Sequence, residues 1–179
     1  MTVVRQYQRG QPITLALESP RQSEVCRLVD ALDAEMTPLY PPESNHLMDI
    51  EALCAPAVRF LVARLDGDAV GCGALRHDAA GYGEVKRMYV RPSARGRHIG
   101  RAILGRIEWE AQAAGLAYLR LETGHRQPAA LGLYRSAGFR ERGPFGDYQE
   151  DPLSVFLEKD LRGGGRAPTT PGNGRAASP

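Results

Sequence analysis

Basic residues gather around one predicted turn of this chain. Seven Lys or Arg residues lie between Lys86 and Arg106, although the formal net charge of the 179 residues is only +2. Within this segment the stretch RPSARGRHIGRA, from Arg91 to Ala102, joins a predicted strand to a predicted helix. The first turn of a helix has unpaired N–H groups and partial positive charge, so it attracts anions.

The residue types in this turn favour a phosphate-bearing ligand. Gly96 and Gly100 allow a ligand to approach the backbone closely. Three side chains add full positive charges, namely Arg95, Arg97 and Arg101. Together these features predict a site for a diphosphate.

Other interpretations of the same stretch fit less well. A Rossmann dinucleotide site needs GxGxxG early in the chain and an acidic residue about 20 positions later, and the glycine spacing here differs. No GxxxxGK[ST] phosphate loop occurs. A nucleic-acid surface stays open as an alternative, but few aromatic residues interleave with the arginines and the net charge is low. A solvated basic helix face would not explain the glycines.

Hydrophobic periodicity predicts the elements that position this turn. Two prolines, Pro41 and Pro42, end the first helix. The patterns predict a strand near 13–17, helices near 19–36 and 49–54, a hairpin within 58–78 that turns at 66–68, a strand within 83–92, a helix at 99–114, a strand within 116–124, a helix within 127–138, and strands within 139–143 and 153–161. An antiparallel hairpin followed by strand–helix–strand implies a mixed α/β sheet with helices on its faces.

The length allows one domain with a full hydrophobic core. We expect it to span residues 12–162, followed by a disordered Gly/Pro-rich tail at 163–179. The scattered cysteines, Cys26, Cys54 and Cys72, form no CxxC pair and suit a reducing cytoplasm rather than a disulfide framework or a zinc site. No apolar run approaches the roughly 20 residues of a membrane span, and no secretory signal is evident. The predicted location is cytoplasmic, without a membrane partner.

The turn and its surroundings resemble the GNAT superfamily of acyl-CoA-dependent N-acyltransferases, in particular a bacterial subgroup whose acceptors are generally unassigned. In the acyl-CoA motif of that family, Arg95 fits the first position and Gly100 the last, whereas His98 stands where a glycine is usual. The segments FLVARLDGDAVGCGAL, GEVKRMYV and LETGHRQPAALGLYRSAGF follow in the family's order, and PFGDY and YPPES resemble the subgroup. The resemblance covers most of residues 13–161.

The resemblance implies the GNAT fold, a mostly antiparallel twisted sheet of about seven strands with about four helices, splayed at its central parallel strand pair. It also implies that acetyl-CoA is the cosubstrate and that no metal takes part. The backbone of the strand before the turn would pair with the pantetheine arm, and the turn would hold the pyrophosphate. The residues expected to bind acetyl-CoA are Met88, Tyr89, Val90, Arg95, Gly96, Arg97, His98, Ile99, Gly100, Arg101 and Gln127.

Acyl transfer to an amine needs an acid and a base. A tyrosine hydroxyl, with a pKa of roughly 10, can protonate a leaving thiolate without already being ionised. Tyr134 matches the tyrosine that commonly does this in the family, and Glu84 matches a frequent general-base position. Three reserve candidates for the base are Tyr148, Glu122 and His125. An acyl-cysteine route through Cys72 is less favoured, because no adjacent His or Lys would lower the pKa of its thiol.

The acceptor would be recognised by the segments LYPPESNHLMD and GPFGDYQEDPLS, which combine carboxylates and aromatic rings. This composition favours a cationic acceptor, although acidic loops are also commonly just solvated. The expected acceptor-binding residues are Tyr40, Glu43 and Tyr148.

The sequence as a whole predicts an enzyme that acetylates a primary amine of a small molecule or peptide by direct attack in a ternary complex. A non-catalytic acyl-CoA sensor is the first alternative, and nucleic-acid binding by the segment from Arg91 to Arg106 is a weaker one. A homodimer stays open, because relatives are often dimers.

Overall fold

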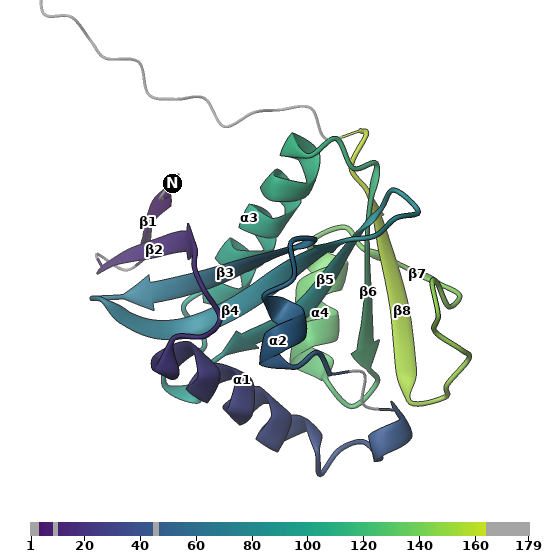
Figure 1. Ribbon diagram of the computed structural model, residues 1–179, viewed down its shortest axis with the longest axis horizontal. Coiled ribbons are helices and arrows are strands. Elements are labelled where there is room, and N and C mark those ends of the chain that lie inside the picture. The colour runs from purple at the N-terminus through teal and green to yellow at the C-terminus, as the bar shows by residue number, and fades with distance from the viewer. Residues whose placement is uncertain (1–3, 9–10, 45–46, 164–179) are drawn as a thin grey trace, which may run out of the picture.

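The computed structural model describes residues 4–8, 11–44 and 47–163, which form an eight-stranded sheet with helices on both faces (Figure 1). The strands are β1 (Val4–Gln8), β2 (Gln11–Leu17), β3 (Val58–Leu65), β4 (Asp68–His77), β5 (Gly83–Val90), β6 (Tyr118–Gly124), β7 (Arg140–Arg142) and β8 (Ser154–Asp160). The helices are α1 (Ser23–Met36), α2 (Ile50–Leu53), α3 (Ile99–Ala113) and α4 (Pro128–Ser136), with 3-10 turns η1 (Pro42–Ser44) and η2 (Pro92–Ala94).

The strands lie in the order β1-β2-β3-β4-β5-β6-β8-β7. Every neighbouring pair is antiparallel except β5 and β6, which run parallel. This confirms the predicted mixed sheet, with its parallel pair near the centre.

The described part of the sheet has one strand more than predicted. β1 precedes residue 12 and pairs with β2, from Val4 opposite Leu15 to Gln8 opposite Gln11. Its sequence, VRQYQ, contains no run of apolar residues, so periodicity gives little signal for it. Apart from Gly163, the tail predicted at 163–179 lies outside the described residues.

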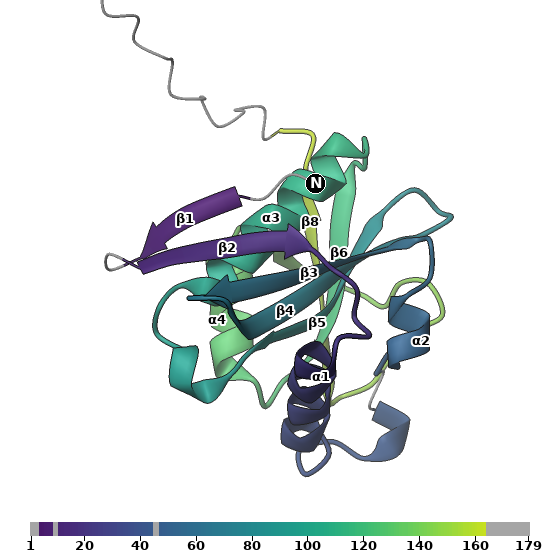
Figure 2. The same ribbon diagram turned by 60° about the vertical axis from the view of Figure 1, so that its left-hand side comes forward.

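The sheet is buried on both faces. On one face α3 and α4 pack over Leu61, Leu75 and Leu119. On the other, α1 and α2 pack over Phe60 and Val62, as the two views of the layers show (Figures 1 and 2). Successive residues of a strand point to opposite faces, and each fully buried large apolar side chain stabilises the fold by roughly 1.5–3 kcal/mol.

The chain reverses between β3 and β4 in a two-residue turn. Leu65 pairs with Asp68, and both residues between them have positive φ, 51° at Asp66 and 92° at Gly67. Such a turn matches the twist of the flanking strands, which is why Asp-Gly predicts it well.

A β-bulge interrupts the pairing of β4 with β5. Two residues of β5, Arg87 and Met88, lie opposite the single residue Gly73 of β4. Arg87 has a φ of 55°, a conformation that is uncommon outside glycine. A Cβ on Gly73 would lie 2.7 Å from Met88 Sδ, so glycine provides the space that the bulge needs.

The bulge changes the direction of the side chains along β5. Val85 packs against the α3 side of the sheet, whereas Tyr89, four residues later, packs against the α1 side. In a regular strand, residues four apart share a face, so the extra residue causes the reversal. Met88 and Val90 are thereby turned toward the α3 side.

The helix α3 begins and ends close to its predicted limits. Gly115 follows it with a φ of 75°, and the Leu116 N–H donates to Ala111 O over 3.0 Å. This six-residue closure through a left-handed glycine is a common helix end. Within the described residues, none of the helices has the length and apolar character needed to cross a membrane.

Candidate active site

The parallel strands β5 and β6 separate soon after they meet. Their pairing covers only Gly83 with Leu119 and Glu84 with Arg120. Beyond these two pairs the strands diverge, as predicted, and Figure 1 shows the opening between them. Backbone groups at the end of β5 are therefore left facing this opening.

Val90 presents such groups. The next residue, Arg91, donates its N–H to Val70 O of β4 over 2.9 Å. Because successive residues direct their backbone groups to opposite neighbours, the N–H and C=O of Val90 point to the side that β6 has left, where the C=O accepts Arg95 Nε over 2.8 Å. An extended ligand can pair with the Val90 N–H at that edge, much as an added strand would.

A pocket of about 720 Å³ opens at this place, between the end of α1, the end of β5, the turn before α3 and the start of α4. Its volume lies within the roughly 300–1,000 Å³ of small-molecule sites. Eleven sequence-predicted site residues line it, namely Met88, Tyr89, Val90, Arg95, Gly96, His98, Ile99, Gly100, Arg101, Gln127 and Tyr134. Arg97, predicted with them, does not line this pocket.

The turn before α3 directs backbone N–H groups outward. Gly96 has a φ of 75° and His98 a φ of 54°. The Ala102 N–H donates to His98 O over 3.0 Å, and the N–H groups of the first helical residues before it have no acceptor within the helix. No atom lies within 4 Å of a Cβ built on Gly96, so this side is open. With Arg101 nearby, these donors fit a diphosphate.

The seven Lys and Arg residues from Lys86 to Arg106, here called the basic cluster, are largely neutralised by carboxylates of the same chain. Five of its seven members form ion pairs, which are Lys86 with Glu84, Arg87 with Asp33, Arg91 with Asp68, Arg95 with Glu35, and Arg106 with Glu110. The cluster is thus mostly part of internal ion pairs, which does not favour the alternative of a nucleic-acid surface.

Arg95 links the α3 turn to α1 and β5. Its Nη2 donates to both oxygens of Glu35, over 2.7 and 2.8 Å. Its Nε donates to Val90 O over 2.8 Å. Glu35 was not predicted as a site residue, because 60 residues separate it from Arg95 and only the fold brings them together.

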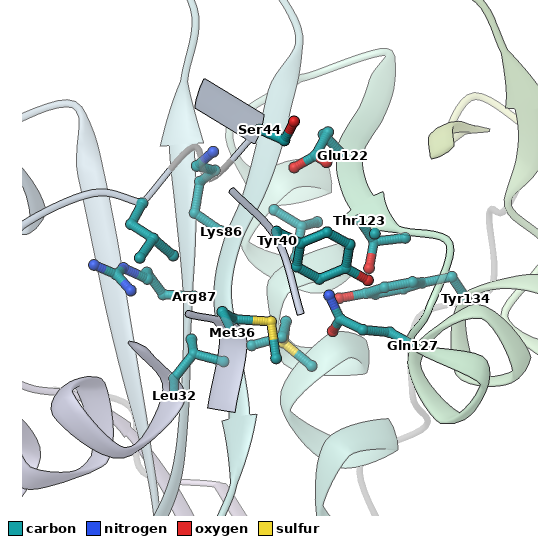
Figure 3. Close-up of a pocket in the computed structure, with 14 residues that line it drawn as sticks. Leu32, Met36, Tyr40, Ser44, Lys86, Arg87, Glu122, Thr123, Gln127 and Tyr134 are labelled. Atoms are coloured by element: carbon teal, nitrogen blue, oxygen red, sulfur yellow. The ribbon is translucent and has the colours of Figure 1, made fainter. Parts of the chain in front are cut away.

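A smaller pocket of about 100 Å³ adjoins the larger one (Figure 3). The two share five lining residues, namely Leu32, Met36, Met88, Gln127 and Tyr134. The polar side chains that line only the smaller pocket include those of Tyr40, Ser44, Lys86, Glu122 and Thr123. Tyr134 therefore stands where two compartments meet.

Tyr134 is suited to donate a proton. Its side chain is buried, and its ring packs edge-on against Phe139, with ring centres 5.8 Å apart. Burial raises the pKa of the Tyr134 hydroxyl, and the negative charge of Glu122 raises it further. The hydroxyl therefore keeps its proton well beyond neutral pH.

Glu84 lies deeper than the sequence suggested, with 1% of its surface exposed. Oε1 accepts the Tyr148 hydroxyl over 2.7 Å and lies 3.4 Å from Lys86 Nζ, while Oε2 lies 2.7 Å from Arg76 Nη2. Glu84 lines neither of the two adjoining pockets. Of these three partners only Lys86 lines the smaller pocket, so the Glu84 carboxylate can act on a ligand there through Lys86.

The PFGDY segment fixes Tyr148 on this network. Phe145 is buried edge-on against Tyr82 and Tyr148, with ring centres 5.7 and 5.0 Å away. Gly146, with a φ of 56°, lets the chain pass Tyr82 closely. Lys86 Nζ donates to the Tyr148 hydroxyl over 2.7 Å. Tyr148, predicted to bind acceptor, lines neither adjoining pocket and instead holds the pocket residue Lys86.

Tyr40 closes the smaller pocket against the end of β6. Its hydroxyl accepts the Arg126 N–H over 3.0 Å. A Cβ on Gly124 would lie only 2.0 Å from the Tyr40 hydroxyl oxygen. Glu43, the third expected acceptor residue, belongs to η1, but its side chain lies outside the described part of the chain.

The remaining candidates do not gather at the pockets. Cys72 is fully buried in β4, and burial raises the pKa of its thiol to about 12, so a thiolate nucleophile there is disfavoured. His125 is exposed, with Nδ1 3.1 Å from Leu153 O. Among the described residues, no three His, Cys, Asp or Glu side chains cluster as metal ligands.

Sequence reasoning missed Lys86, Thr123 and the apolar end of α1, where Leu32 and Met36 line both pockets. Lys86 and Thr123 lie within the two predicted strands that were expected to diverge, so the sequence could have placed them at the site. No local pattern could have placed the end of α1 against them.

The residue His98 allows a direct test of the turn. We expect His98→Gly to raise the free energy of unfolding by about 0.5–1 kcal/mol, because a left-handed conformation costs a non-glycine residue about 1–2 kcal/mol, offset partly by the greater chain entropy of glycine. Affinity for acetyl-CoA should change little, since the backbone N–H remains. Denaturant unfolding and calorimetry measure both quantities.

The converse variant, Gly96→Ala, is the control. It adds a methyl group in open space but at a φ of 75°, so it should lower stability by about 1 kcal/mol. A His98→Gly protein that is less stable, or that binds acetyl-CoA markedly more weakly, would contradict this account of the turn.

Comparisons with known proteins agree with this geometry. A family model described as "Acetyltransferase (GNAT) domain" matches residues 56–141. The "IAA acetyltransferase" of Azospirillum brasilense is 57% identical over 150 residues, which cover 83% of this chain and 98% of that protein.

Solved structures are similar over the same extent. One from Klebsiella pneumoniae, described as a candidate acyl-CoA N-acyltransferase, has a TM-score of 0.70 and 39% identity, covering 83% of this chain and 97% of the other. The PaiA N-acetyltransferase of Thermoplasma acidophilum, solved in complex with coenzyme A, has the same fold, with a TM-score of 0.64 and 18% identity over 83% of this chain and 98% of the other. The chain therefore belongs to the GNAT superfamily, and it is an acyltransferase that uses acetyl-CoA as its acetyl donor.

Proposed function

We propose that this enzyme acetylates a primary amine of a small molecule or peptide by direct attack in a ternary complex. The observation that carries the proposal is the position of Tyr134, whose side chain lines both adjoining pockets. One pocket can then hold acetyl-CoA while the other holds the acceptor, so both substrates can be present together.

Residues of the larger pocket would bind acetyl-CoA. The N–H groups of the turn before α3, with Arg101, would hold the pyrophosphate, and the Val90 backbone would pair with the pantetheine arm. Gln127 lines both pockets and offers an amide to the same ligand. A backbone N–H at the end of β5, where β5 and β6 diverge, would stabilise negative charge on the thioester oxygen.

In the proposed reaction the acceptor amine attacks the thioester of acetyl-CoA directly. The acceptor nitrogen forms a bond to the acetyl carbon, and the bond from that carbon to the CoA sulfur breaks. The acceptor's ammonium group first gives one proton to a base, and Tyr134 gives its proton to the leaving sulfur. As the amide forms, the nitrogen loses a second proton, which returns to the Tyr134 oxygen and restores the acid. Glu84 stays a prediction for that base, acting through Lys86 and Tyr148 because its own carboxylate is enclosed.

A panel of amines tests the proposal through the release of free CoA from acetyl-CoA. It should contain amino acids, polyamines, aminoglycosides and peptides, with the compound abbreviated IAA in the name of the A. brasilense relative as a further acceptor. The proposal expects faster CoA release with at least one amine, and an N-acetylated product by mass spectrometry. Acetylation of non-amine acceptors alone would overturn it.

A cytoplasmic location and a homodimer also stay predictions.

A further inference from the structure

Lys86 of β5 and Glu122 of β6 face the opening between these two strands. The last parallel pair before the opening is Glu84 with Arg120. Lys86 and Glu122 lie two positions further along the same strands, and therefore on the same face, where the strands diverge. Both line the smaller pocket. Figure 3 shows the Glu122 carboxylate directed from β6 into the gap, on the side that carries Lys86 and Ser44.

The two carboxylates near this gap differ in access. Glu84 is 1% exposed and lies behind the pocket, between Arg76, Lys86 and Tyr148. Glu122 is half-buried and forms part of the pocket wall. An ammonium group in the smaller pocket can contact Glu122 directly, whereas it cannot contact Glu84 without displacing Lys86 or Tyr148.

The surroundings of Glu122 fix its orientation and place it near the proposed acid. Ser154 Oγ of β8 donates to Glu122 Oε1 over 2.7 Å. Three titratable groups face it from neighbouring elements, namely Lys86 of β5, Tyr134 of α4 and Tyr148 of the segment before β8. The negative charge of Glu122 raises the pKa of the Tyr134 hydroxyl, and Tyr134 lies at the junction of the two pockets.

We propose that Glu122 is the carboxylate that meets the acceptor's ammonium group in the smaller pocket and takes its proton before attack. The inference rests on the proposed amine acetylation and names a residue for its base. The proton moves from nitrogen to a Glu122 oxygen, and the freed lone pair of the nitrogen forms the bond to the acetyl carbon. Glu84 then serves as a positioning residue that holds Lys86 and Tyr148.

The test is Glu122→Gln, assayed with an amine that the wild type acetylates. Glutamine keeps an oxygen to accept the Ser154 hydroxyl but cannot take the proton. At pH 7 we expect kcat/KM for the amine to fall by about 100-fold or more, which is typical for loss of a general base. The acetyl-CoA dissociation constant, measured by calorimetry, should stay within about threefold.

The pH dependence of the loss separates a base from a structural residue. An alkyl amine has a pKa of roughly 10, so its neutral fraction rises about tenfold for each pH unit below that value. The defect of Glu122→Gln should therefore shrink between pH 7 and 10, because the variant depends on amine that is already neutral. A merely structural defect would be the same at every pH.

Two further variants complete the experiment. Glu108→Gln removes another half-buried carboxylate, whose Oε2 lies 2.8 Å from Lys159 Nζ and which lines neither adjoining pocket, so it should keep wild-type kinetics. Glu84→Gln should give a loss that does not shrink with pH. The inference is overturned if Glu122→Gln acts like wild type, if its loss is independent of pH, or if Glu84→Gln alone shows the pH-dependent loss. A wild type that acetylates no amine would instead overturn the proposed function, and this inference with it.

Discussion

Replacing Tyr134 by phenylalanine is expected to lower kcat by about 100-fold, while KM for acetyl-CoA changes by less than about threefold. The substitution removes only the hydroxyl, and the ring can keep its edge-on contact with Phe139. Without that proton donor the CoA sulfur must leave as a thiolate. Steady-state kinetics with acetyl-CoA and an accepting amine measure the effect.

The dependence of the wild-type rate on pH also tests the role of Tyr134. Because burial and Glu122 both raise the pKa of Tyr134, the acid form persists as pH rises. The wild-type rate should therefore show no fall attributable to tyrosine ionisation up to a pH of about 10, where an ordinary tyrosine is already half ionised. Tyr118→Phe, at the far end of β6 and outside both adjoining pockets, is the control and should keep wild-type kinetics. Equal rates for Tyr134→Phe and wild type would remove Tyr134 from the chemistry.

Gly124→Ala is expected to lower kcat/KM for the acceptor by about 5- to 150-fold, the kinetic equivalent of an overpacking cost of roughly 1–3 kcal/mol. The added Cβ would lie 2.0 Å from Tyr40 atoms, so the Tyr40 side chain must leave its place against β6. Its hydrogen bond with the Arg126 N–H would break, and the smaller pocket would lose that wall.

A double-mutant cycle identifies the cause. If Gly124→Ala acts through Tyr40, it should add little to the loss in a Tyr40→Ala background. Gly132→Ala in α4 is the matched control, because no atom lies within 4 Å of its Cβ, and it should leave kinetics unchanged and add about 0.5–1 kcal/mol of stability. Additive losses for Gly124→Ala and Tyr40→Ala would show that they act independently.

Most elements of the fold could be predicted because their signals are local. The Asp66-Gly67 turn, the apolar stripe of α3 and its end at Gly115 are each set by a few neighbouring residues. The bulge at Arg87 could not be predicted in this way. It depends on Gly73 of the neighbouring strand, which makes room for Met88.

The candidate site was predicted in part for the same reason. The turn before α3 carries its own signal in glycines, arginines and a helix start, so ten of the predicted cofactor residues line the larger pocket. The acceptor side is assembled from the end of α1, the segment that follows it, β5, β6 and α4, and its charges cannot be placed without the fold. Glu84 matched a motif, but its burial follows from Arg76, Lys86 and Tyr148 around it.

The position of bound coenzyme A is the most direct measure of this account. In a crystal of the protein with coenzyme A, we predict the pyrophosphate at the backbone N–H groups between Gly96 and Arg101, and the sulfur beside the Tyr134 hydroxyl. Density for the ligand outside the larger pocket, or a sulfur remote from Tyr134 with the pocket filled, would contradict it.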